Sequence, residues 1–157
     1  MPAIDERLKS LGITLPTPVP PVANYVPFVV SGQHLFVSGQ ICAGQDGKVG
    51  ERHQGKVGGG VSSEAGREAA RFAAINVLAQ AKAALGDLDR IARCVRLGGF
   101  INCVPDFAPL PQVMNGASDL MVEVFGDKGR HARTTVGVAN LPLNCAVEVE
   151  GIFELAR

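Results

Sequence analysis

The chain has 157 residues, of which 46% are apolar and 19% are charged, and the 15 Lys and Arg balance the 15 Asp and Glu. This length suits one hydrophobic core and is short for two, so we expect a single domain over 1–157, with residues 1–21 as an N-terminal extension. A net charge of zero supplies no field that would attract nucleic acid, a polyanion or a membrane surface.

The N-terminus and the hydropathy pattern argue against membrane insertion and secretion. Acidic residues follow Met1 closely without an apolar stretch, which is unlike a signal peptide. No segment approaches the roughly 20 apolar residues that a membrane-spanning helix requires. We therefore expect a cytoplasmic protein that does not contact a membrane.

The cysteines and histidines do not have the spacing of metal ligands. No two cysteines form a C-x-x-C pair, and the histidines lie far apart in the sequence. We expect no metal site and interpret the cysteines as reduced, buried, small hydrophobic residues. These residues are Cys42, Cys94, Cys103, Cys145, His34, His53 and His131.

The first third of the chain predicts a short helix over 4–13 that Gly12 ends, then an extended proline-rich arm over 16–21. Two β-rich runs at 24–30 and 34–41 are separated by a hairpin signal. Gly39 interrupts the second run and predicts a β-bulge or a close approach to the backbone.

The segment 44–61 is rich in glycine and predicts a mobile loop without packed structure. It lacks the glycine patterns of phosphate-binding loops, and we expect no cofactor. An alanine-rich helix over 63–85 follows, capped by Ser62 or Ser63 and closed by Gly86. Its predicted core-facing stripe is Phe72, Ile75, Leu78, Ala79 and Leu85.

The second half predicts a strand over 91–103, a helix over 112–125 delayed by prolines, and two strands over 134–138 and 146–155. The order β-β-α-β-α-β-β indicates an α+β fold, with two helices on one face of a mostly antiparallel sheet. The other face would then need a partner.

The last predicted strand places Glu148, Glu150 and Glu154 on one face. Carboxylates in such a row are usually only solvated. Because the run headed by Arg133 is close in sequence and could pair with this strand, Arg133 could also approach a glutamate. From spacing alone, a solvated face, a structural salt bridge and a ligand site all remain open.

Several segments, in the same order, resemble the Rid (YjgF-like) family. The C-terminal signature carries an arginine before a strand, a Leu-Pro turn and a Val-Glu-Val-Glu strand, and earlier segments agree across about 22–155. The segments are Tyr25, FVSGQ at 36–40, DFA at 106–108, ARTTVGVANLP at 132–142 and VEVE at 147–150.

The resemblance implies a chorismate-mutase-like fold and a homotrimer with clefts between subunits. It implies cofactor-free hydrolysis of reactive 2-imino or enamino acids to 2-keto acids and ammonia. Arg133 would hold the substrate carboxylate, and Glu148 would position the water or the imine. The resemblance assigns the lining of the cleft to Tyr25, Gly39, Thr135 and Asn115.

The sequence also departs from the family pattern. Thr135 stands where deaminases commonly carry cysteine, and His131 replaces a usual proline. A non-catalytic module that binds a small carboxylate is therefore the main alternative, whereas chorismate mutase activity has no sequence support. Ribonuclease activity is disfavoured by zero net charge, one Tyr and no Trp.

Overall fold

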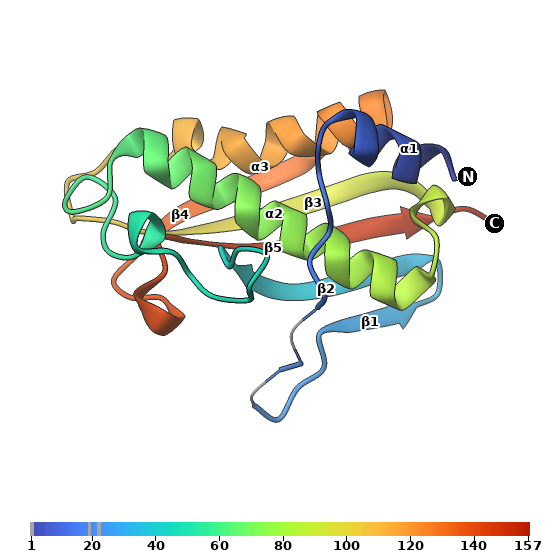
Figure 1. The fold of residues 1–157 in the computed structure, drawn as a ribbon, viewed down its shortest axis with the longest axis horizontal. Coiled ribbons are helices and arrows are strands. Elements are labelled where there is room, and N and C mark those ends of the chain that lie inside the picture. The colour runs from blue at the N-terminus through green and yellow to red at the C-terminus, as the bar shows by residue number, and fades with distance from the viewer. Residues whose placement is uncertain (1, 19, 22) are drawn as a thin grey trace.

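The computed structural model describes residues 2–18, 20–21 and 23–157. It contains one five-stranded sheet with the strand order β1-β2-β5-β3-β4 and long helices on one face (Figure 1). No helix among the described residues is long and apolar enough to cross a membrane. The strands are β1 Phe28–Ser31, β2 His34–Ile41, β3 Ile91–Asn102, β4 Ala132–Val138 and β5 Val147–Leu155.

The sheet is antiparallel except at one edge. Strand β2 pairs with β1 and β5, and β5 also pairs with β3, all antiparallel. Strand β4 pairs with β3 in parallel, so β3 separates β4 from β5. The suggestion that β4 could pair with β5 was therefore wrong. A helix connects β3 to β4, and such a crossover is what parallel neighbours require.

Two long helices lie side by side over one face of the sheet, as predicted: α2, Ser63–Leu85, and α3, Leu110–Phe125 (Figure 1). The Ser62 hydroxyl accepts a hydrogen bond from the Ala65 amide and caps α2. Gly86 ends α2 with a φ of +74°, a conformation that favours glycine.

The buried face of α2 differs in part from the predicted stripe. Leu78, Ala79 and Leu85 are buried, but Phe72 and Ile75 are only half-buried. Alanines form most of the buried face, because small side chains allow α2 to lie close to the sheet and to α3. The buried alanines are Ala65, Ala69, Ala70, Ala73, Ala74, Ala79 and Ala81.

The N-terminal helix α1, Ala3–Ser10, docks onto this helical layer. It buries Leu8, and Asp5 forms an ion pair with Lys82 of α2 at 2.7 Å. The helix ends at Ser10, before the predicted stop at Gly12, whose φ is +70°.

The prediction that 44–61 lacks packed structure was wrong. The segment contains a short 3₁₀ turn, Glu51–His53, and isolated bridges join Gln54 to Cys145 and Val57 to Cys103. Its few apolar side chains lie between the glycines and fill the core beside α2, which fixes the backbone. The buried residues are Val49, His53, Val57 and Val61.

Candidate functional site

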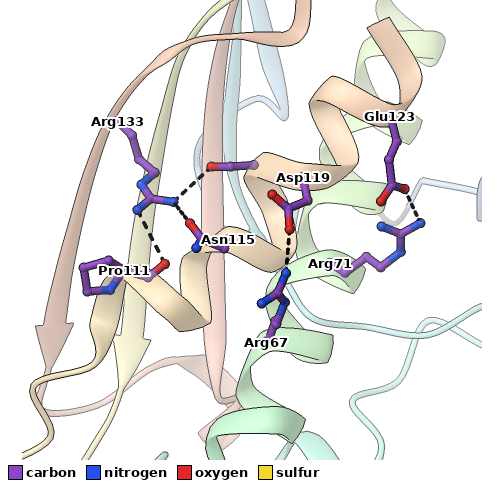
Figure 2. Close-up of polar contacts among 8 residues, drawn as sticks. Arg67, Arg71, Pro111, Asn115, Asp119, Glu123 and Arg133 are labelled. Atoms are coloured by element: carbon purple, nitrogen blue, oxygen red, sulfur yellow. Dashed lines mark hydrogen bonds and ion pairs between the residues drawn. The ribbon is translucent and has the colours of Figure 1, made fainter. Parts of the chain in front are cut away.

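Arg133 lies on β4 and points toward α3. Its register partner is Leu97, which is buried beneath the helices, and directly paired residues share a face of a sheet. The guanidinium Nη1 donates to Asn115 Oδ1 at 2.8 Å and to Ser118 Oγ at 3.1 Å, and Nη2 lies 3.5 Å from the Pro111 carbonyl oxygen (Figure 2). The structure thus joins Arg133 and Asn115, two of the predicted site residues, through a direct hydrogen bond.

Two residues that sequence reasoning did not assign to the site complete this cluster. Ser118 lies one turn beyond Asn115 on α3, and its Oγ is 2.9 Å from Nε2 of His131. His131 precedes β4, and its Nδ1 is 2.6 Å from the Gly129 carbonyl oxygen. We define the arginine cluster as Arg133, Asn115, Ser118 and His131. The i, i+3 spacing of the two α3 residues is the signal that could have identified Ser118.

Thr135 lies two residues after Arg133 and on the same face of β4, opposite Gly99. Its hydroxyl oxygen is buried and has no hydrogen-bond partner among the described residues. A buried hydroxyl without a partner is uncommon in folded proteins. Thr135 therefore offers an unused polar atom beside the arginine cluster.

Glu148 and Gly39 form a second cluster on the opposite face of the sheet. Glu148 pairs with Phe100 of β3 and Ile41 of β2, and the β2 register shifts between Val37 and Gln40, which confirms the predicted bulge at Gly39. A Cβ added at Gly39 would lie 2.5 Å from Glu148 Oε1. The absence of a side chain at this position provides the space for the carboxylate.

The electrostatic environment of Glu148 favours a protonated carboxyl group. Partial burial raises the pKa of Glu148, and the neighbouring negative charge of Glu150 raises it further. Glu150 itself forms an ion pair with Arg96 at 3.3 Å on the same face. The pKa of Glu148 therefore lies above the usual glutamate value, which suits this carboxylate to accepting a proton.

Tyr25 lies just before β1, with 52% of its surface exposed. Strand β1 is at the edge of the sheet opposite to β4, so Tyr25 and the arginine cluster are at opposite ends of the strand order.

The suggestion that Arg133 approaches a glutamate was also wrong within one chain. The described partners of Arg133 are two side chains of α3 and a backbone carbonyl, none of them a carboxylate.

The described residues contain no group of three or more His, Cys, Asp or Glu that could hold a metal ion. The cysteines are free thiols, of which Cys42, Cys94 and Cys145 are buried and Cys103 is half-buried. The candidate site thus consists of two polar clusters, one on each face of the sheet, and an exposed tyrosine at its far edge.

Comparison with known proteins places this arrangement in a family. The family model described as "YjgF/chorismate_mutase-like, putative endoribonuclease" matches residues 5–155. Protein TCP17 of Trypanosoma cruzi is 48% identical over 150 residues, which is 95% of this chain and 92% of the relative.

Solved structures agree with this result. A protein of unknown function from Agrobacterium tumefaciens is 47% identical, with a TM-score of 0.89 over 98% of this chain and 92% of the other. A "putative endoribonuclease" from Shewanella oneidensis is 36% identical, with a TM-score of 0.92 over 97% of this chain and 99% of the other. The Escherichia coli protein TdcF, solved with bound serine, shares the fold at 23% identity. Its TM-score is 0.64 over 91% of this chain and 96% of the other. The chain belongs to the YjgF/chorismate-mutase-like family and has its α+β fold.

Proposed function

We propose that this protein hydrolyses reactive 2-imino and enamino acids to 2-keto acids and ammonia, in clefts between the subunits of a homotrimer. The observation that carries this proposal is the guanidinium of Arg133, which Asn115 and Ser118 hold by one nitrogen. Among the described contacts, Nε of Arg133 has no hydrogen-bond acceptor, and Nη2 has only the Pro111 carbonyl oxygen at 3.5 Å. A planar guanidinium with a free edge is suited to bidentate binding of a carboxylate.

The chemistry needs little beyond orientation and one proton acceptor. Water adds to the electrophilic imine carbon, and the resulting carbinolamine expels ammonia to leave the keto group. Glu148 would take a proton from the attacking water, and its raised pKa makes it a suitable base for this step. Fixing the substrate through its carboxylate beside this water would supply much of the remaining acceleration.

A trimer would bring the two clusters together. The face of the sheet opposite the helices carries apolar side chains that are paired across strands, with Val29 beside Phe36 and Phe36 beside Ile152. Val29 is 48% exposed and Phe36 is 43% exposed, and apolar sheet faces of this kind are typical of buried interfaces. In such an assembly, Arg133 of one subunit would meet Glu148 and Tyr25 of its neighbour.

The second candidate function is binding of a small carboxylate without turnover. It is favoured by Thr135, which stands where deaminases commonly carry cysteine and whose buried hydroxyl has no evident role in proton transfer. The Escherichia coli relative TdcF was solved with bound serine, which is itself a small carboxylate. Binding of a small carboxylate is common to both candidates, and only turnover separates them.

A coupled assay tests the proposal. An amino-acid oxidase generates short-lived imines, and the appearance of the keto acid is followed with and without this protein. We expect acceleration by the wild-type protein and none by Arg133→Ala. Acceleration that persists in Arg133→Ala would reject the site. Carboxylate binding without acceleration, across several imines, would favour the binding module.

A further inference from the structure

We propose that Ser118 and His131 are positioning residues that fix the guanidinium of Arg133 through a chain of oriented hydrogen bonds. The chain begins at the backbone carbonyl of Gly129 and passes through the imidazole and the hydroxyl to Nη1 of the arginine. The functional meaning of this chain rests on the proposed function of Arg133 as the carboxylate anchor.

The direction of each hydrogen bond in the chain is determined by chemistry. The Gly129 carbonyl oxygen can only accept, so Nδ1 of His131, at 2.6 Å, must carry the proton. In a neutral imidazole Nε2 is then an acceptor, and the Ser118 hydroxyl donates to it across 2.9 Å. Because this hydroxyl proton is committed to His131, a lone pair of Ser118 Oγ faces Nη1 of Arg133 at 3.1 Å.

The environment of the imidazole keeps it in this neutral form. Burial lowers the pKa of His131, and the positive charge of Arg133 lowers it further, although the Gly129 carbonyl opposes both effects. A neutral His131 is what the chain requires, because a protonated ring would donate from both nitrogens and could not accept from Ser118.

This chain of hydrogen bonds determines which edge of the Arg133 guanidinium faces a ligand. Asn115 and Ser118 are three residues apart on α3, so both acceptors lie on one side of the helix and hold the same nitrogen. Without Ser118, one acceptor would remain on Nη1 and the guanidinium plane could rotate about it. A fixed plane matters for binding a carboxylate through two parallel hydrogen bonds.

The test measures binding of pyruvate to the full-length protein by titration, together with nitrogen NMR of the His131 ring and the Arg133 side chain. We expect Ser118→Ala and His131→Phe each to weaken pyruvate binding by about tenfold, the loss typical of one hydrogen bond to a charged group. His131→Gln should restore binding to within about threefold, since its amide oxygen can accept from the Ser118 hydroxyl.

The matched control is Asp119→Asn, next to Ser118 on α3, whose side chain pairs instead with Arg67 at 2.5 Å (Figure 2). We expect this variant to bind pyruvate like the wild type. In the wild-type spectrum we expect a neutral His131 protonated on Nδ1, and Arg133 resonances that broaden or shift in Ser118→Ala.

The outcomes separate this proposal from the proposed function. If Arg133→Ala loses pyruvate binding but Ser118→Ala and His131→Phe do not, the positioning role is overturned and the anchor role stands. If Arg133→Ala binds pyruvate normally, or the wild type does not bind it, the anchor role fails. The hydrogen-bond chain is then tested by NMR alone. A His131 ring protonated on Nε2, or Arg133 resonances that do not change in Ser118→Ala, would overturn it.

Discussion

Arg133 and Glu148 lie on opposite faces of the same sheet. Arg133 is opposite Leu97 and points to α3, whereas Glu148 is opposite Phe100, the third residue beyond Leu97 on β3. Because side chains alternate along a strand, residues three apart in β3 have opposite directions. One chain therefore cannot place both side chains on one small ligand, and a shared site requires a second copy.

This separation predicts that inactive variants complement each other. Arg133→Ala and Glu148→Gln should each be inactive alone in imine hydrolysis. Mixed trimers co-expressed from equal amounts of the two should recover roughly one third of wild-type activity, because each mixed trimer has one intact cleft in three. Activity is measured on mixed trimers isolated with two different affinity tags. Absence of recovery in verified mixed trimers would mean that the two residues do not act across an interface.

A second prediction concerns the space beside Glu148. A methyl group at position 39 would lie 2.5 Å from Glu148 Oε1, and the end of a glutamate side chain moves more easily than backbone. We expect Gly39→Ala to displace the carboxylate and reduce kcat at least tenfold, with a loss of stability of under about 1 kcal/mol. Steady-state kinetics and chemical denaturation measure the two effects.

The matched control for this variant is Gly50→Ala. Gly50 has a φ of −68°, which alanine adopts readily, and nothing lies within 4 Å of an added Cβ. Its kinetics should equal those of the wild type. Equal kcat values in Gly39→Ala and the wild type would show that the position of the Glu148 carboxylate does not matter for turnover.

The third prediction is a pH dependence set by Glu148. Because burial and Glu150 raise the pKa of Glu148, the base form is lost as the pH falls through a value above the usual glutamate range. We expect kcat/KM to decline on this acid side. Glu150→Gln removes the neighbouring charge and should move the decline to lower pH. A decline that stays at the same pH in this variant would assign the titration to another group.

The same raised pKa has a consequence for stability. A carboxyl group with a raised folded-state pKa contributes stability that is fully present below the unfolded-state pKa and is lost as the pH rises through the folded-state value. At neutral pH the charged Glu148 therefore destabilises the fold, and Glu148→Gln should raise the thermal midpoint there. The gain should vanish in acid, and a gain that is independent of pH would contradict this linkage.

Much of the architecture was predictable from local signals. A serine cap at position 62 or 63, Gly86 and an alanine-rich run predicted α2 with its correct ends, and the hairpin signal between the first two β-rich runs predicted the β1–β2 hairpin. Local signals did not determine the place of β4 in the sheet, because a β-rich segment of sequence does not show which strand it pairs with. Only the crossover through α3 places β4 beside β3.

The resemblance suggested residues for the candidate site, but the sequence did not determine their geometry. The resemblance identified Arg133 and Asn115, which the structure joins through a hydrogen bond. Residue periodicity within each strand could not place Arg133 and Glu148 relative to each other, because that requires the register of β3 with both β4 and β5. Ser118 and His131 were missed as partners because a 3₁₀ turn, Gly126–Gly129, brings the chain from α3 back to β4, and the sequence does not specify its path.

The last prediction concerns the contact between the two long helices that supports the arginine cluster. A Cβ added at Gly116 of α3 would overlap the backbone carbonyl of Arg67 in α2, and a backbone atom cannot move aside as a side chain does. Overpacking of this kind costs about 1–3 kcal/mol, so Gly116→Ala should lower the free energy of unfolding by that amount. Because Gly116 follows Asn115 directly, the displaced helix should also weaken pyruvate binding at Arg133.

Asp119→Ala is the control on the same helix. It removes an exposed ion pair with Arg67 whose partners are both about half exposed, and such pairs contribute under about 1 kcal/mol. Chemical denaturation of both variants, followed by pyruvate titration, compares the two helix contacts directly. If Gly116→Ala were as stable as the wild type, the close approach of α2 and α3 would not be what holds Asn115 and Ser118 against Arg133.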